Sequence, residues 1–175
     1  IPMRTVRTLL CLIVLLSLIA APVLAGPAAK PGKTSPPRST ADVVDVSVRP
    51  AELTAEAGGE VSFQVHLAIA DTWHLYDHSY TEDPEAFFIG LDMVPGEDAA
   101  LAGYKAIFPE GEHGEFMGEK VVMLHHDADV DVTVQLPADA SGEVAIPLVV
   151  SAQACDDKVC LRPSDIPVTA LVRVQ

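Results

Sequence analysis

The stretch Val61-Ser62-Phe63-Gln64-Val65-His66-Leu67 alternates apolar with polar side chains, and Val130-Asp131-Val132-Thr133-Val134-Gln135-Leu136 repeats the pattern. Successive side chains of a β-strand point to opposite faces, so this period of two predicts strands with one buried face. Residues 44–48 and 168–174 alternate in the same way. Residues 145–152 are more continuously apolar, which predicts a strand buried on both faces, and Pro147 indicates an edge or a bulge near its start.

Turn-forming residue pairs separate these runs, among them Gly58-Gly59, Pro95-Gly96 and Ser141-Gly142. The chain also has 14 prolines, too many for long helices. About seven or eight short strands in roughly 135 residues are typical of two packed antiparallel sheets. The sequence therefore predicts an all-β protein whose single domain is an immunoglobulin-like antiparallel β-sandwich.

The first 25 residues have the pattern of a secretory signal peptide, in which Arg4 and Arg7 precede an apolar run that ends in small residues. The run is shorter than the roughly 20 apolar residues that span a bilayer, and Pro22 interrupts it, which argues against a membrane anchor. We expect residues 1–25 to be cleaved, with no stable membrane insertion afterwards. Residues 26–40, rich in Pro, Lys and Ser, should form a flexible tether, and residues 41–175 the folded domain. The signal peptide resembles those of bacteria, so we expect the mature protein in the periplasm.

The predicted domain is strongly acidic. Six basic residues stand against all 25 acidic residues of the chain, which leaves a formal charge of −19. Such a charge repels nucleic acid and anionic lipid, so we exclude both as partners. We expect a monomer.

Cys155 and Cys160 are the cysteines that remain after cleavage, because Cys11 lies in the signal. Outside the cytoplasm they can form a disulfide. A ring this short contributes only about 2 kcal/mol through chain entropy, which makes reversible exchange a candidate role. The spacing leaves such exchange and a structural hairpin staple equally open. We expect the pair on an exposed turn between two strands, where the charges of Asp156 and Asp157 disfavour thiolate.

A metal site around His125 and His126 is disfavoured by the sequence. The aspartates at positions 127, 129 and 131 share one face of a strand and apolar residues the other, which is the pattern of a solvated face over a core. No His or Met follows Cys160, which argues against a blue-copper site. We therefore expect no metal site at these residues.

Aromatic residues are few, and several lie between Trp73 and Phe88. We expect Trp73 in the core. In a strand, His74 and Tyr76 face the other way, so one of them should reach the surface. Phe116 lies in a polar stretch bounded by glycines, where it is either a loop residue folded into the core or a lid over a reactive group, and residue type alone favours the core.

Three segments together resemble the N-terminal periplasmic domain of the DsbD family of thiol:disulfide interchange proteins. Gln153-Ala154-Cys155, a four-residue gap and Cys160-Leu161-Arg162-Pro163 resemble the cysteine motif of that domain. Asp71-Thr72-Trp73-His74-Leu75-Tyr76 resembles its aspartate and aromatic segment, and Glu115-Phe116-Met117-Gly118 its cap loop, with Met117 where a Tyr is usual. The order of the segments agrees, and the resemblance spans about residues 43–174.

The resemblance implies an immunoglobulin-like sandwich whose cysteines cycle between dithiol and disulfide, with a protein-disulfide reductase type of activity and no bound cofactor. Cys160 would form the mixed disulfide with a partner, and Cys155 would resolve it. Phe116 would be the cap that shields the pair and moves aside for a partner, and Tyr76 the tyrosine near the pair.

The family's full-length proteins continue into a membrane domain and a thioredoxin-like domain. We expect this chain to be a stand-alone form. It would take electrons from a thioredoxin-like or DsbD-type membrane reductase and pass them to exported thiol or disulfide proteins. Two alternatives remain: a non-catalytic extracytoplasmic binding module with a structural disulfide, and a metal carrier that uses His125, His126 or the cysteines.

Overall fold

The computed structural model describes residues 36–82 and 85–175. The predicted signal peptide, and the predicted tether up to residue 35, lie outside the described residues. In chain order the elements are η1 (Thr40–Asp42), β1 (Val44–Arg49), β2 (Leu53–Ala55), β3 (Glu60–Ile69), β4 (His74–Tyr76), α1 (Ser79–Glu82), β5 (Asp92–Pro95), β6 (Gly103–Ile107), β7 (Glu112–Phe116), β8 (Glu119–His125), β9 (Asp127–Gln135), β10 (Glu143–Ala152), β11 (Ala154–Cys155) and β12 (Ser164–Val174).

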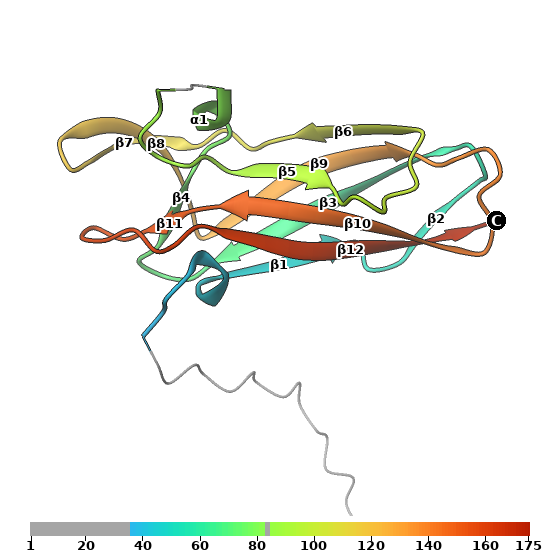
Figure 1. Cartoon of the computed structure of the whole chain (residues 1–175), viewed down its shortest axis with the longest axis horizontal. Coiled ribbons are helices and arrows are strands. Elements are labelled where there is room, and N and C mark those ends of the chain that lie inside the picture. The colour runs from blue at the N-terminus through green and yellow to red at the C-terminus, as the bar shows by residue number, and fades with distance from the viewer. Residues whose placement is uncertain (1–35, 83–84) are drawn as a thin grey trace, which may run out of the picture. The chain divides into compact units, whose positions relative to one another are not determined.

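Two four-stranded sheets form the body of the domain, in the orders β1-β3-β9-β6 and β2-β12-β10-β5 (Figure 1). The two stretches that predicted the fold pair with each other as β3 and β9, with Val65 opposite Val130 and Phe63 opposite Val132. The neighbouring strands run antiparallel, apart from the parallel pair β12 and β2. The predicted all-β, immunoglobulin-like antiparallel sandwich is confirmed.

One apolar core fills the space between these sheets. Alternate residues of β3 and β9 enter it from one side, and those of β10 and β12 from the other. Trp73 packs against this core as expected.

The expectation that residues 145–152 are buried on both faces is wrong. Ile146, Leu148 and Val150 are buried, whereas Val149 and Ser151 are only half-buried, because a single layer covers β10. The pairing of β10 with β5 begins at Leu148, and Pro147 O accepts one bond from Gly96 N (2.9 Å), so the strand has an open edge before Pro147, as the proline predicted.

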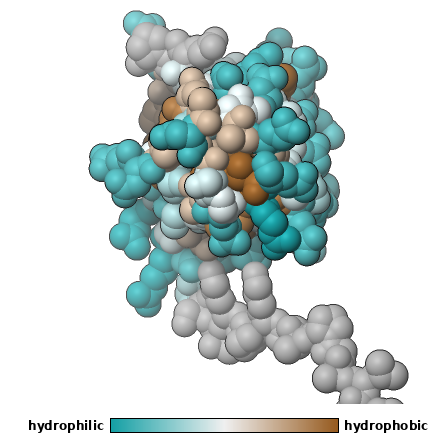
Figure 2. All heavy atoms as spheres, turned by 90° about the vertical axis from the view of Figure 1, so that its right-hand side faces the viewer, coloured by the Kyte–Doolittle hydropathy of each residue, from teal (hydrophilic) through white to brown (hydrophobic). Residues whose placement is uncertain are grey.

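A third four-stranded sheet, in the order β11-β4-β8-β7, lies at one end of the sandwich, on the left in Figure 1. On β8, strand β4 pairs only with Met123–His125, while β7 pairs with residues 119–123 of the same strand. The β7–β8 hairpin therefore projects beyond β4 as a two-stranded arm. Figure 2 views the opposite end, where hydrophilic side chains surround a smaller hydrophobic patch.

Among residues 36–82 and 85–175, no helix is long and apolar enough to cross a membrane.

Candidate functional site

The two cysteines lie on a small hairpin that follows β11. Cys155 ends β11 and forms a disulfide with Cys160, with Cα atoms 4.0 Å apart. Backbone hydrogen bonds close the same hairpin: Leu161 N donates to Ala154 O (2.8 Å), and Asp156 N donates to Val159 O (2.9 Å). The backbone thus holds the cysteines together independently of the sulfur bond.

Asp156 shapes the turn of this hairpin. Its carboxylate accepts hydrogen bonds from the backbone N–H groups of Val159 (2.7 Å) and Lys158 (2.8 Å), as aspartate does in Asx turns. These two bonds are the main reason why the pKa of Asp156 lies below its usual value. The sequence suggested only a charge effect of Asp156 on the thiols and missed this role.

Thr40 connects the start of the domain to the base of the hairpin. Its hydroxyl donates to Arg162 O (3.1 Å) and accepts from Ala154 N (2.9 Å), and its own N–H also donates to Arg162 O (3.0 Å). The Thr40 side chain is fully buried, although the sequence placed this residue in the tether. Gln153 adds a bond from its side-chain amide to Leu161 O (3.0 Å). These contacts hold both flanks of the cysteine hairpin.

Cys155 belongs to a small apolar cluster separate from the main core. Its other buried members are Tyr76, Phe116 and Val121, and the rings of Tyr76 and Phe116 meet edge to face at 6.3 Å. Phe88 stacks on Tyr76 with ring centroids 4.2 Å apart. The structure thus brings together Cys155, Tyr76 and Phe116, which the sequence grouped only through the family resemblance.

The two cysteines differ in exposure. Cys155 has no exposed surface, whereas Cys160 is exposed. The expectation of a pair exposed together on a turn is therefore wrong for Cys155, because the end of β11 is covered by the cluster around Phe116.

Phe116 ends β7 and precedes the turn into β8. Met117 and Gly118 adopt positive φ angles of 54° and 87°, which suit the tight turn of a two-residue hairpin loop. The turn sends neighbouring side chains in opposite directions: Phe116 is 5% exposed and Met117 is 78% exposed. Of the two interpretations of Phe116, burial among other side chains is observed, and its neighbours there are Cys155 and Tyr76.

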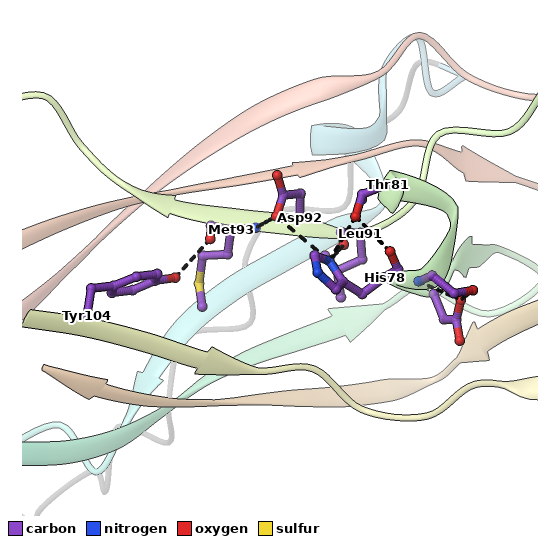
Figure 3. Close-up of polar contacts among 8 residues, drawn as sticks. His78, Thr81, Leu91, Asp92, Met93 and Tyr104 are labelled. Atoms are coloured by element: carbon purple, nitrogen blue, oxygen red, sulfur yellow. Dashed lines mark hydrogen bonds and ion pairs between the residues drawn. The ribbon is translucent and has the colours of Figure 1, made fainter. Parts of the chain in front are cut away.

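Polar contacts hold the residues that flank the segment carrying Phe88, between His78 and Leu91 (Figure 3). His78 Nδ1 hydrogen-bonds to Leu91 O (2.9 Å), and the Tyr104 hydroxyl donates to Met93 O (2.8 Å) on the strand that follows. The first contact joins the residues on either side of the segment, and Tyr104 anchors the strand that follows it.

His74 and Tyr76 both lie inside, which corrects the expectation that one of them reaches the surface. They are 4% and 0% exposed, because the ring of Phe116 packs against His74 and the ring of Phe88 stacks on Tyr76. Burial, followed by the charge of His125, lowers the pKa of His74, while Asp157 and Asp156 act in the opposite direction. Burial is also the main cause of the raised pKa of Tyr76.

The residues considered for a metal do not converge. Within the described ranges no group of three or more His, Cys, Asp or Glu side chains could hold a metal ion. The aspartates of β9 face outward as predicted, and two of them hold a residue that the sequence analysis passed over: buried His66 contacts Asp129 (2.8 Å) and Asp127 (3.3 Å).

Comparison with protein families matches residues 41–170 to the model of the N-terminal part of the thiol:disulfide interchange protein DsbD. Comparison with curated protein sequences found no match. The crystal structure of the N-terminal periplasmic domain of ScsB from Proteus mirabilis has a TM-score of 0.52 and 10% identity over 74% of this chain and 46% of that chain. The N-terminal domain of Neisseria meningitidis DsbD in its reduced form has a TM-score of 0.42 and 24% identity over 71% of this chain and 82% of that chain. The chain thus spans less than half the length of the ScsB chain, and that likeness bears on the fold.

Proposed function

The chain belongs to the DsbD N-terminal family, and on that premise we propose that its Cys155–Cys160 pair is a reversible carrier of two electrons in the periplasm. In the reduced form Cys160 attacks a disulfide of an exported protein, and Cys155 then resolves the mixed disulfide. A thioredoxin-like or DsbD-type membrane reductase restores the dithiol. Two sulfur atoms suffice for this exchange, so the carrier needs no bound cofactor.

One observation carries the proposal: the cysteine hairpin is held by contacts that do not involve sulfur. The backbone bonds between residues 154–161, the Asp156 turn and the Thr40 hydroxyl hold the two flanks together. A bridge across so short a ring adds only about 2 kcal/mol through chain entropy. In this proposal these contacts keep the hairpin closed when the disulfide opens, so the domain stays folded, as a carrier requires.

The unequal exposure of the cysteines supports the assignment of roles. An attacking thiol must be reached by a partner, and Cys160 is exposed, whereas Cys155 is enclosed with Phe116 and Tyr76. In this proposal Phe116 is the cap. It covers Cys155 when no partner is bound and moves aside when a partner docks. Tyr76 forms the floor of the same cluster and supports the ring of Phe116.

The reduction potential of the pair tests this function. The protein is equilibrated with thiol buffers of known potential, free thiols are alkylated, and the oxidised fraction is measured by mass spectrometry. Exchange proteins lie between about −120 and −270 mV, so we expect a value in that range. A value below about −300 mV would make the bridge structural, and the function would then be that of a binding module.

A further inference from the structure

His74 is a buried titratable residue that has no role in the exchange described above. It is 4% exposed, and the register of β4 against β11 places it directly opposite Cys155. Side chains directly opposite on an antiparallel pair share a face, with Cβ atoms about 4.5–5.5 Å apart. The His74 ring also packs edge-on against Phe116, with centroids 5.4 Å apart. Imidazole and thiol therefore share the space beneath the cap.

The resolving step needs a base at this place. Only the thiolate of Cys155 can attack, and burial in an apolar cluster favours the neutral thiol. The other ionisable side chains of the cluster are the phenols of Tyr76 and Tyr80. Burial raises the pKa of Tyr76, so this phenol stays protonated at neutral pH and cannot take the proton.

We propose that His74 is the general base of the resolving step, an inference that rests on the exchange function proposed above. In the mixed disulfide, neutral His74 takes the proton from Cys155 Sγ. The Cys155 thiolate attacks Cys160 Sγ and forms the intramolecular disulfide. The bond between Cys160 and the partner's sulfur breaks, and that sulfur leaves with the bonding electron pair and takes the proton from the imidazolium. The cysteine pair is thereby oxidised and the partner is reduced.

The groups that face His74 suit this task. The ring of His125 on β8 lies 5.6 Å away, and with burial it keeps the imidazole neutral and able to accept a proton. Asp157 and Asp156, on the cysteine hairpin, favour the imidazolium once it has formed. The Tyr76 hydroxyl lies 3.4 Å from His74 Nε2 and orients the ring.

The reaction of the reduced protein with Ellman's reagent, an aromatic disulfide, separates the two steps. Attack by Cys160 releases one coloured thiolate, and resolution by Cys155 releases a second. The aromatic thiolate leaves without taking up a proton. The rate of the second release therefore depends on how readily Cys155 loses its own proton. In His74→Gln we expect an unchanged first rate and a second rate about 100-fold slower at neutral pH, because general-base catalysis contributes roughly that much. The second rate should recover at higher pH, where Cys155 ionises unaided.

Two further variants keep the test independent of folding damage. His125→Gln removes the like charge beside His74, so the pH at which the second rate rises should shift upward. His113→Gln changes an exposed histidine of the same sheet and should behave as wild type.

The outcomes separate the role of His74 from the exchange function. An unchanged second rate in His74→Gln, or equal slowing of both rates, would overturn the role of His74. A wild-type protein that releases only one equivalent would refute the exchange function itself.

Discussion

The Thr40→Val substitution tests whether the N-terminal residues of the domain hold the cysteine hairpin. Valine has nearly the same shape, but it can neither donate to Arg162 O nor accept from Ala154 N. Arg162 O still accepts a hydrogen bond from the backbone N–H of residue 40, so the stability lost at this carbonyl is small. Ala154 is fully buried, and its N–H would be left without an acceptor, which costs about 1–3 kcal/mol. We expect a loss of about 2 kcal/mol in the free energy of unfolding.

Urea unfolding followed by tryptophan fluorescence measures this loss, because Trp73 is the single tryptophan and packs against the core. With a slope of about 2 kcal/mol per M, the midpoint should fall by roughly 1 M. Thr40→Ser keeps the hydroxyl, so its free energy of unfolding should fall only slightly. Thr169→Val, on an exposed position of β12, should stay within about 0.5 kcal/mol of wild type. A midpoint for Thr40→Val that matches Thr169→Val would refute the reasoning.

Two further predictions concern the thiols. In a Cys160→Ser background, Phe116→Ala should speed the alkylation of Cys155 by iodoacetamide roughly tenfold, because the ring that covers this thiol is gone. The control is Phe87→Ala, which removes a ring that is 88% exposed, and an equal effect of both would argue against a cap. With oxidised glutathione, reduced Cys155→Ser should accumulate a mixed disulfide at Cys160, and Cys160→Ser should form at least about tenfold less, because its remaining thiol is buried. Intact-mass measurement counts the adducts, and equal yields would reverse the assigned roles.

The sandwich could be predicted from the sequence because burial on one face of a strand leaves a local mark. Phe63 and Val132 alternate with polar neighbours in their own strands, and the two strands then pair with these residues opposite each other. The same logic failed for residues 145–152, where small apolar side chains such as Val149 fill half-buried positions on the outer face. Composition alone does not distinguish that face from a second buried one.

The site could be predicted only in part, because its contacts join residues far apart in the chain. The cysteine spacing pointed to Cys155 and Cys160, but nothing near Thr40 in sequence indicates that its hydroxyl bonds to Arg162, 122 residues away. The burial of His74 also depends on the ring of Phe116, which is 42 residues away in the chain and has no signature in the residues around His74. The predicted alternation of side chains along residues 73–76 was right, but the predicted exposure was wrong, because the rings of Phe116 and Phe88 pack against the second face.

The projecting β7–β8 hairpin has a mechanical consequence. Its ladder with β4 is confined to Met123–His125, and Val122 is hydrogen-bonded to Asp77 N and the Tyr80 hydroxyl, so in the proposed opening the part that carries Phe116 would swing about Val122 as one ribbon. Such a swing separates aromatic side chains but leaves the ladder between β7 and β8 intact. Hinge motions of this kind take microseconds to milliseconds. In the proposed function, the rate of electron transfer would then be limited by the docking of the partner and by thiol–disulfide exchange, and the motion of the hairpin would not limit it.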